Sequence, residues 1–137
     1  MRRFIVAATI AASITGIVAG PAHAAKGGPA SSSSSLSLVV LNSSDGQPHW
    51  GGQVTFNVST TATSQPFVEL DCYQNGVHVY WASAGFFDSY PWQWARDFTL
   101  RSDYWTSGAA SCTAVLYYVT SNGRTRTLAT LDFAVAA

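Results

Sequence analysis

The sequence predicts an all-β protein, an antiparallel β-sandwich of about seven strands with one buried disulfide. Apolar and polar residues alternate with a period of two along most of the chain, whereas helical periodicity is missing after the N-terminal region. Two Asn-Gly pairs, at 75–76 and 122–123, each separate two such stretches. This dipeptide favours a tight hairpin turn, because both central positions of a type I′ turn need a positive φ.

The first 24 residues have the pattern of a secretory signal peptide. Arg2 and Arg3 precede an apolar stretch over 4–18, and Ala22-His23-Ala24 is typical of a signal-peptidase site. The apolar stretch is shorter than the roughly 20 residues that a membrane span needs. We therefore expect cleavage before Ala25 and a protein that is secreted or held at the cell surface.

Composition divides the remaining chain into a lead-in and one domain. Residues 25–35 are rich in Gly and Ser and predict a flexible segment, while 36–137 is long enough for a single core. After cleavage five basic and seven acidic residues remain, a net charge of −2. So few basic residues argue against binding nucleic acid or anionic lipid, and the apolar pattern predicts no membrane insertion of the mature chain.

Turn residues mark the boundaries of the expected strands. Asn42–Gly52, Thr60–Gln65 and Ser102–Gly108 read as loops. Arg96 interrupts the apolar face of one predicted strand, which indicates a bulge or an edge position there. The expected strands are 36–41, 54–59, 68–73, 78–83, 92–100, 110–121 and 124–135.

A two-residue turn at 75–76 fixes the register of the first hairpin. It sets Cys72 opposite Val79 and Leu70 opposite Trp81, so that these four side chains share one apolar face. The other face then carries a polar set: Glu69, Asp71, Tyr73, His78, Tyr80 and Ala82.

The second hairpin gives the same result for its own cysteine. A two-residue turn at 122–123 sets Cys112 opposite Phe133 on an apolar face, and Tyr117 opposite Leu128 on the other face. The chain has two cysteines, and an even pair in an exported protein favours a disulfide. We therefore predict a buried Cys72–Cys112 bond that links the two hairpins.

The chain resembles a bacterial immunoglobulin-like domain of the secreted, single-domain kind made by actinomycetes. The residues that carry the resemblance are the early strand 52–58 (Gly-Gln-Val-Thr-Phe-Asn-Val), Cys72, Trp81 nine residues later, and Cys112 on the penultimate strand. It covers roughly 36–135 and implies an immunoglobulin-like sandwich. Antibody-type domains place a tyrosine two residues before the second cysteine, where this chain has Ala110.

An aromatic-rich segment is the first candidate binding surface. It holds Phe86, Phe87, Tyr90, Trp92 and Trp94 around Pro91. These rings are either core or, for the last three, exposed. Exposed rings would stack on sugars or anchor a protein partner.

The polar face of the first hairpin is the second candidate. Tyr73, His78 and Tyr80 are expected to project together, and Tyr117 to join them if the hairpins are sheet neighbours. Such a face is either ordinary solvated surface or a tyrosine-rich recognition patch.

Catalytic and metal-binding chemistry are not indicated. Glu69 and Asp71 would lie about 6.5–7 Å apart on one strand, near glycosidase separations, but on a flat face. His49 and His78 share no metal-ligand spacing, so we expect no cofactor.

The sequence therefore favours a non-enzymatic recognition or cell-surface interaction module, whose partner is a protein or a component of the cell wall. A carbohydrate-binding module that uses Trp92 and Trp94 is the alternative. A hydrolase inhibitor that presents the 42–52 loop is a further one.

Overall fold

The computed structural model describes residues 32–137, so the predicted signal peptide and most of the lead-in lie outside the described residues. β1 begins at Ser34, two residues before the predicted start. No helix in the described range is long and apolar enough to cross a membrane. The elements are β1 (Ser34–Leu41), β2 (Gln53–Thr60), β3 (Phe67–Gln74), β4 (Val77–Gly85), η1 (Gln93–Arg96), β5 (Phe98–Thr99), β6 (Ala110–Val119) and β7 (Thr125–Val135).

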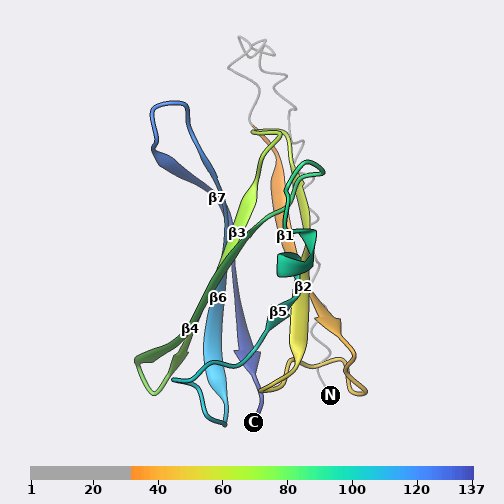
Figure 1. Ribbon diagram of the computed structural model, residues 1–137, viewed down its shortest axis with the longest axis vertical. Helices are drawn as coiled ribbons and strands as arrows, with labels where there is room; N and C mark the ends of the chain where they lie inside the picture. The colour runs from red at the N-terminus through yellow and green to blue at the C-terminus, as the bar shows by residue number, and fades with distance from the viewer. Residues whose placement is uncertain (1–31) are drawn as a thin grey trace, which may run out of the picture. The chain divides into compact units, whose positions relative to one another are not determined.

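The seven strands form the predicted sandwich of two antiparallel sheets (Figure 1). One sheet has the strand order β1-β2-β5, and the other has the order β4-β3-β6-β7. This order places β3, β6 and β7 together as the C, F and G strands of an immunoglobulin-like sandwich, with β4 added at the edge. The β6–β7 hairpin extends beyond the rest of its sheet.

The core fills the space between the sheets with alternate side chains from both. β2 contributes Val54 and Phe56, and β6 contributes every second residue from Ala110 to Leu116. Alternation of this kind is why the period-two pattern was informative. The remaining buried residues are Val68, Leu70, Cys72, Val79, Ala84, Phe98, Leu100, Trp105 and Val135.

The predicted disulfide is present and buried. Cys72 and Cys112 are direct cross-strand partners on β3 and β6, with Cα atoms 4.1 Å apart. The bond therefore lies within one sheet, whereas antibody domains link the two sheets. It fastens the two central strands of the four-stranded sheet.

The register predicted for the first hairpin is right at the turn and wrong beyond it. Asn75 and Gly76 both have positive φ, and Tyr73 pairs with His78 as expected. A β-bulge then makes Val79 the extra residue, so Cys72 faces Tyr80 and Asp71 faces Trp81. The bulge turns two consecutive side chains, those of Val79 and Tyr80, toward the core.

The second hairpin contains two compensating irregularities. Its loop has three residues rather than two, because Thr120 bonds across it to Gly123 and Arg124 and only Gly123 has a positive φ. A bulge at Leu128 then restores the predicted register, so Cys112 pairs with Phe133 as expected. Tyr117 pairs with Thr127, so the prediction that it faces Leu128 is wrong.

The strand predicted over 92–100 is also wrong. Residues 93–96 form a 3₁₀ turn, and only Phe98 and Thr99 pair with β2. The side chain of Arg96 bonds the carbonyl oxygens of Gly85 and Phe87 from this turn.

Trp105 closes one end of the core from the loop before β6. Its side chain is fully buried, its indole N–H donates to the Gly108 carbonyl oxygen at 3.0 Å, and its ring packs edge-on against Tyr80. The buried tryptophan of this fold is therefore Trp105, whereas Trp81, expected in the core, is largely exposed.

Removing the disulfide should destabilise the domain strongly. The bond closes a sequence separation of 40, for which the chain-entropy model gives about 4 kcal/mol, within a usual range of about 2–5 kcal/mol. We expect Cys72→Ala/Cys112→Ala to lose that free energy of unfolding in urea titrations. Wild type in reductant is the matched measurement, and equal stability in all three samples would contradict the prediction.

Candidate functional site

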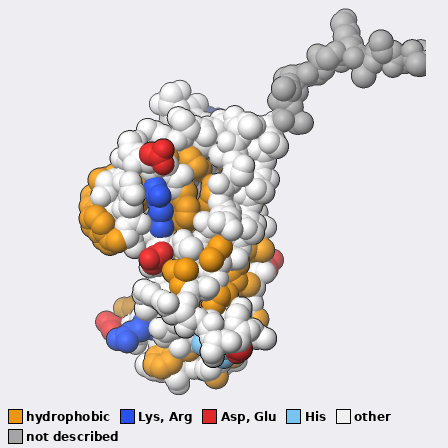
Figure 2. Space-filling model, turned by 90° about the vertical axis from the view of Figure 1, so that its right-hand side faces the viewer, with side chains coloured by type: hydrophobic (Ala, Val, Ile, Leu, Met, Phe, Trp, Pro, Cys, Tyr) orange, Lys and Arg blue, Asp and Glu red, His pale blue; other side chains and the backbone are white. Residues whose placement is uncertain are grey.

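Large aromatic side chains lie exposed at several places on the described surface. Trp81 is 60% exposed, Trp92 55%, Trp94 72% and Tyr104 85%. In Figure 2 hydrophobic side chains form separate patches among uncharged polar groups, and charged side chains are few. Isolated exposed apolar residues are ordinary, but clustered large rings mark interaction sites.

The first cluster joins the two candidate surfaces of the sequence analysis. Tyr117 stacks on Phe67 with ring centroids 5.7 Å apart, and Phe67 packs edge-on against Tyr90 at 6.2 Å. Tyr90 in turn meets Trp92 at 5.7 Å. We name this group, with Phe87, the Trp92 cluster. Trp94 stands next to it on η1 and is more exposed.

Gly85 allows this cluster to lie against the sheet. A Cβ atom at this position would come within 2.6 Å of the Phe87 ring and 2.5 Å of the Tyr90 ring. Separations this short do not occur in real structures, so any side chain here would displace both rings. Gly85 pairs with Phe67 across β3 and β4, which places the whole cluster at one end of the outer sheet face.

Arg96 holds the segment that carries Trp92 and Trp94. Its Nε donates to the Gly85 carbonyl oxygen at 2.8 Å, and an Nη donates to the Phe87 carbonyl oxygen. The guanidinium also lies 5.5 Å from the centre of the Phe86 ring, a cation–π contact. This residue therefore fixes the loop rather than pairing with an acid.

The second group lies toward the other end of the same face. Tyr73 and His78 are cross-strand partners with ring centroids 4.9 Å apart, and His78 Nε2 is 2.6 Å from Asp71 Oδ1. Trp81 faces Asp71 across the strands. We name Tyr73, His78, Trp81 and Tyr104 the Trp81 surface.

The expected grouping of Tyr73, Tyr80 and Tyr117 is wrong in two respects. Tyr80 packs against the core because of the bulge, and its burial raises its pKa to about 12. Tyr117 is on the expected face and lies 3.1 Å from the Ser83 hydroxyl oxygen. It pairs with Phe67, about 20 Å along β3 from Tyr73 at 3.3 Å per residue.

The exposed surface also includes Trp81 and Tyr104, whose exposure was not predicted from the sequence. An unbroken register predicts Trp81 on the apolar face that includes Cys72. In the sequence, the run Val79-Tyr80-Trp81 departs from strict alternation. This departure is the signal from which the bulge could have been predicted. Nothing in the local pattern distinguished Tyr104 from Trp105, which is buried.

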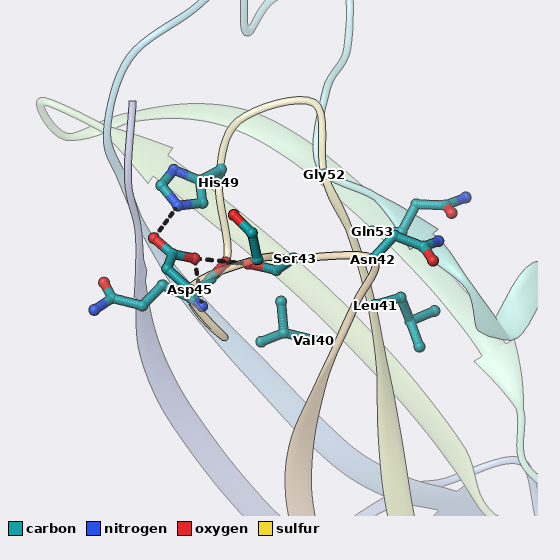
Figure 3. Close-up of a pocket in the computed structure, with 10 residues that line it drawn as sticks. Val40, Leu41, Asn42, Ser43, Asp45, His49, Gly52 and Gln53 are labelled. Carbon is teal, nitrogen blue, oxygen red and sulfur yellow. Dashed lines mark hydrogen bonds and ion pairs between the residues drawn. The ribbon is translucent and has the colours of Figure 1, made fainter.

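The 42–52 loop encloses a shallow hollow of about 180 Å³ (Figure 3). Asp45 is its centre: Oδ1 accepts from the Ser43 hydroxyl at 2.7 Å, and Oδ2 lies 2.9 Å from His49 Nε2. Ser43 and His49 thus contact opposite oxygens of one carboxylate instead of each other. The arrangement differs from that of an activated nucleophile, in which the hydroxyl contacts the base.

No three His, Cys, Asp or Glu side chains gather in the part of the chain that the structure describes. Comparison of the chain with protein-family models, with curated proteins and with solved structures finds no match. The surface geometry therefore carries the argument about function.

Replacing Arg96 should loosen the Trp92–Trp94 segment. Arg96→Ala removes two charge-assisted hydrogen bonds, and we expect it to cost about 1.5–3 kcal/mol of stability. It should also raise acrylamide quenching of tryptophan fluorescence. Arg101→Ala, at an exposed arginine on the next loop, is the matched control. An equal effect of both substitutions would show that Arg96 does not hold the segment.

The Asp45–His49 pair should make stability depend on pH. Hydrogen bonds from Ser43, then Gln47 and His49, hold the pKa of Asp45 well below its ordinary 3.8. Its contribution is therefore present above pH 3.8 and is lost as pH falls toward the lowered value. The bond to Asp45, then that to the Ala137 carbonyl oxygen, raises the pKa of His49 above 6.5. Its contribution is present below pH 6.5 and is lost as pH rises through the raised value.

We expect the stability advantage of wild type over Asp45→Asn/His49→Gln to be largest between the ordinary values of 3.8 and 6.5. The advantage should shrink on both sides, and it should be small because both groups are exposed. Urea unfolding from acid to mildly alkaline pH measures it, with Asp88→Asn as control. A difference that stays constant with pH would refute the assignment.

Proposed function

We propose that this chain is an exported, non-enzymatic binding module that recognises a protein or a cell-wall component through its exposed aromatic side chains. The observation that carries the proposal is the exposure of Trp81, Trp92, Trp94 and Tyr104, each more than half open to solvent. Burying one large apolar side chain is worth about 1.5–3 kcal/mol, so a partner that covers them gains affinity. Tryptophan and tyrosine are also the residues enriched at binding hot spots.

The rigidity of the scaffold supports the same proposal. The disulfide fastens β3 to β6, and Arg96 fixes the loop that bears Trp92 and Trp94. Side chains that are held before binding lose less conformational entropy on association. The buried disulfide is also what an oxidising, extracellular location favours.

Carbohydrate binding at Trp92 and Trp94 is a second candidate function. Both rings are more than half exposed; Trp94 lies on η1 and Trp92 is the residue just before it. Flat exposed rings stack on the apolar faces of sugars. If this candidate is right, tryptophan fluorescence should shift when the sugar is added, and the shift should disappear in Trp94→Ala.

The proposed function is tested by photo-crosslinking in the presence of the envelope and extracellular fraction of the producing cells. p-Benzoylphenylalanine replaces Trp81 or Trp94 in separate samples, and it replaces the exposed Asn57 of the other sheet as control. We expect discrete adducts at an aromatic position that exceed those at the control. Equal labelling at all three positions, or none at any, would overturn the proposal.

A further inference from the structure

A groove lies beside Trp81 along the edge of the four-stranded sheet. Its volume is about 380 Å³, within the usual range of ligand sites. Trp81 and Tyr104 line it from β4 and from the loop before β6, and both rings are more than half exposed. The other lining residues are His78, Val79, Tyr80 and Ser102.

β4 is an edge strand, but beside the groove its backbone is not open to pairing with a strand of a partner. The Val79 carbonyl oxygen, which the bulge turns out of the sheet ladder, accepts a hydrogen bond from the Ser102 hydroxyl. Ser102 also holds the backbone amides of Tyr104 and Trp105. These bonds tie the Tyr104 side of the groove to the sheet. A partner at the groove would therefore be recognised through side chains and not through strand pairing.

Two acidic residues flank Trp81 on the outer face of the sheet. Asp71 is the cross-strand partner of Trp81, and Glu69 is its diagonal neighbour on the same face. Strands β3, β4 and β6 contain no lysine or arginine. His78, which lines the groove, is paired with Asp71. The arginine nearest in sequence to a lining residue is the exposed Arg101, which precedes Ser102.

We propose that the Trp81 surface binds an arginine side chain presented by a partner protein. The planar guanidinium stacks on an indole face and at the same time offers paired N–H donors to a carboxylate. Trp81 supplies the ring, and the Tyr104 ring covers the aliphatic stem. Glu69 supplies a carboxylate that has no hydrogen-bond or ion-pair partner among residues 32–137. This inference rests on the proposed function and names the chemistry of the partner.

Two other occupants fit the surface less well. A second copy related by a two-fold axis that passes through this surface would set Glu69 and Asp71 near the same residues of its partner, and like charges repel. The phosphates of a nucleic acid would be repelled by the same two carboxylates. A cationic side chain is the occupant whose charge complements the surface.

The probe for this inference is a short peptide in which arginine alternates with serine, compared with a peptide in which citrulline replaces each arginine. Citrulline keeps the shape of arginine without its charge. We expect wild type to bind the arginine peptide at least about tenfold more tightly by calorimetry. Trp81→Ala should weaken binding about fivefold, as the loss of an exposed cation–π contact does.

Matched variants separate a local site from general electrostatic attraction. Glu69→Gln should weaken binding about threefold, whereas Asp88→Asn, which removes the same charge elsewhere, should leave it unchanged. Equal effects of these two variants, or equal affinity for the citrulline peptide, would overturn the inference. Self-association that Arg124→Gln/Arg126→Gln abolishes would assign the surface to a second copy and would overturn it too.

Failure here is distinguishable from failure of the proposed function. If the arginine peptide does not bind but crosslinks at Trp94 still exceed those at Asn57, the binding module stands and the arginine site is wrong. If the peptide binds at Trp81 while crosslinking detects no partner at any position, the site chemistry stands and the proposed biological role is wrong.

Discussion

The extra residue at Val79 is the constraint on which the surface of this protein depends. Without the bulge, strict alternation would place Trp81 between the sheets and Tyr80 in solvent. With it, Val79 and Tyr80 both face the core, and Trp81 faces outward opposite Asp71. The bulge is retained by contacts on both sides: the Ser102 hydroxyl bonds the Val79 carbonyl oxygen, and Trp105 packs on the Tyr80 ring.

The second aromatic surface depends on a different exception to regular structure. A strand through 92–100 would have alternated Trp92 and Trp94 with polar residues on a flat sheet. The segment instead forms a 3₁₀ turn, and Arg96 donates to the carbonyl oxygens of Gly85, at the end of β4, and of Phe87 in the loop after it. Gly85 then admits the rings of Phe87 and Tyr90 against the strand. Both exposed surfaces thus arise where the chain departs from the pattern that builds its core.

The sequence was sufficient for the fold because the fold rests on alternation and on cysteine pairing. Both hairpins placed their cysteines on an apolar face, and this was right even though each hairpin contains a bulge. In the second hairpin the longer loop and the bulge at Leu128 shift the register in opposite directions, so that Cys112 keeps its predicted partner on β7. In the first hairpin the bulge on β4 changes the partner of Cys72 but not the face on which Cys72 lies. The sites were less predictable, because one inserted residue reverses every side chain beyond it.

The position of the disulfide explains how such a small sandwich tolerates so many exposed rings. It joins β3 and β6 within the four-stranded sheet, directly beneath the outer face that carries Tyr73 and Trp81. The stabilisation that the bond supplies does not depend on burying those rings. The core is completed instead by burial of Phe98 from β5 and of Trp105 from the loop before β6. Tyr73 and Trp81 are therefore free of a structural role in the core, which is the condition for using them in recognition.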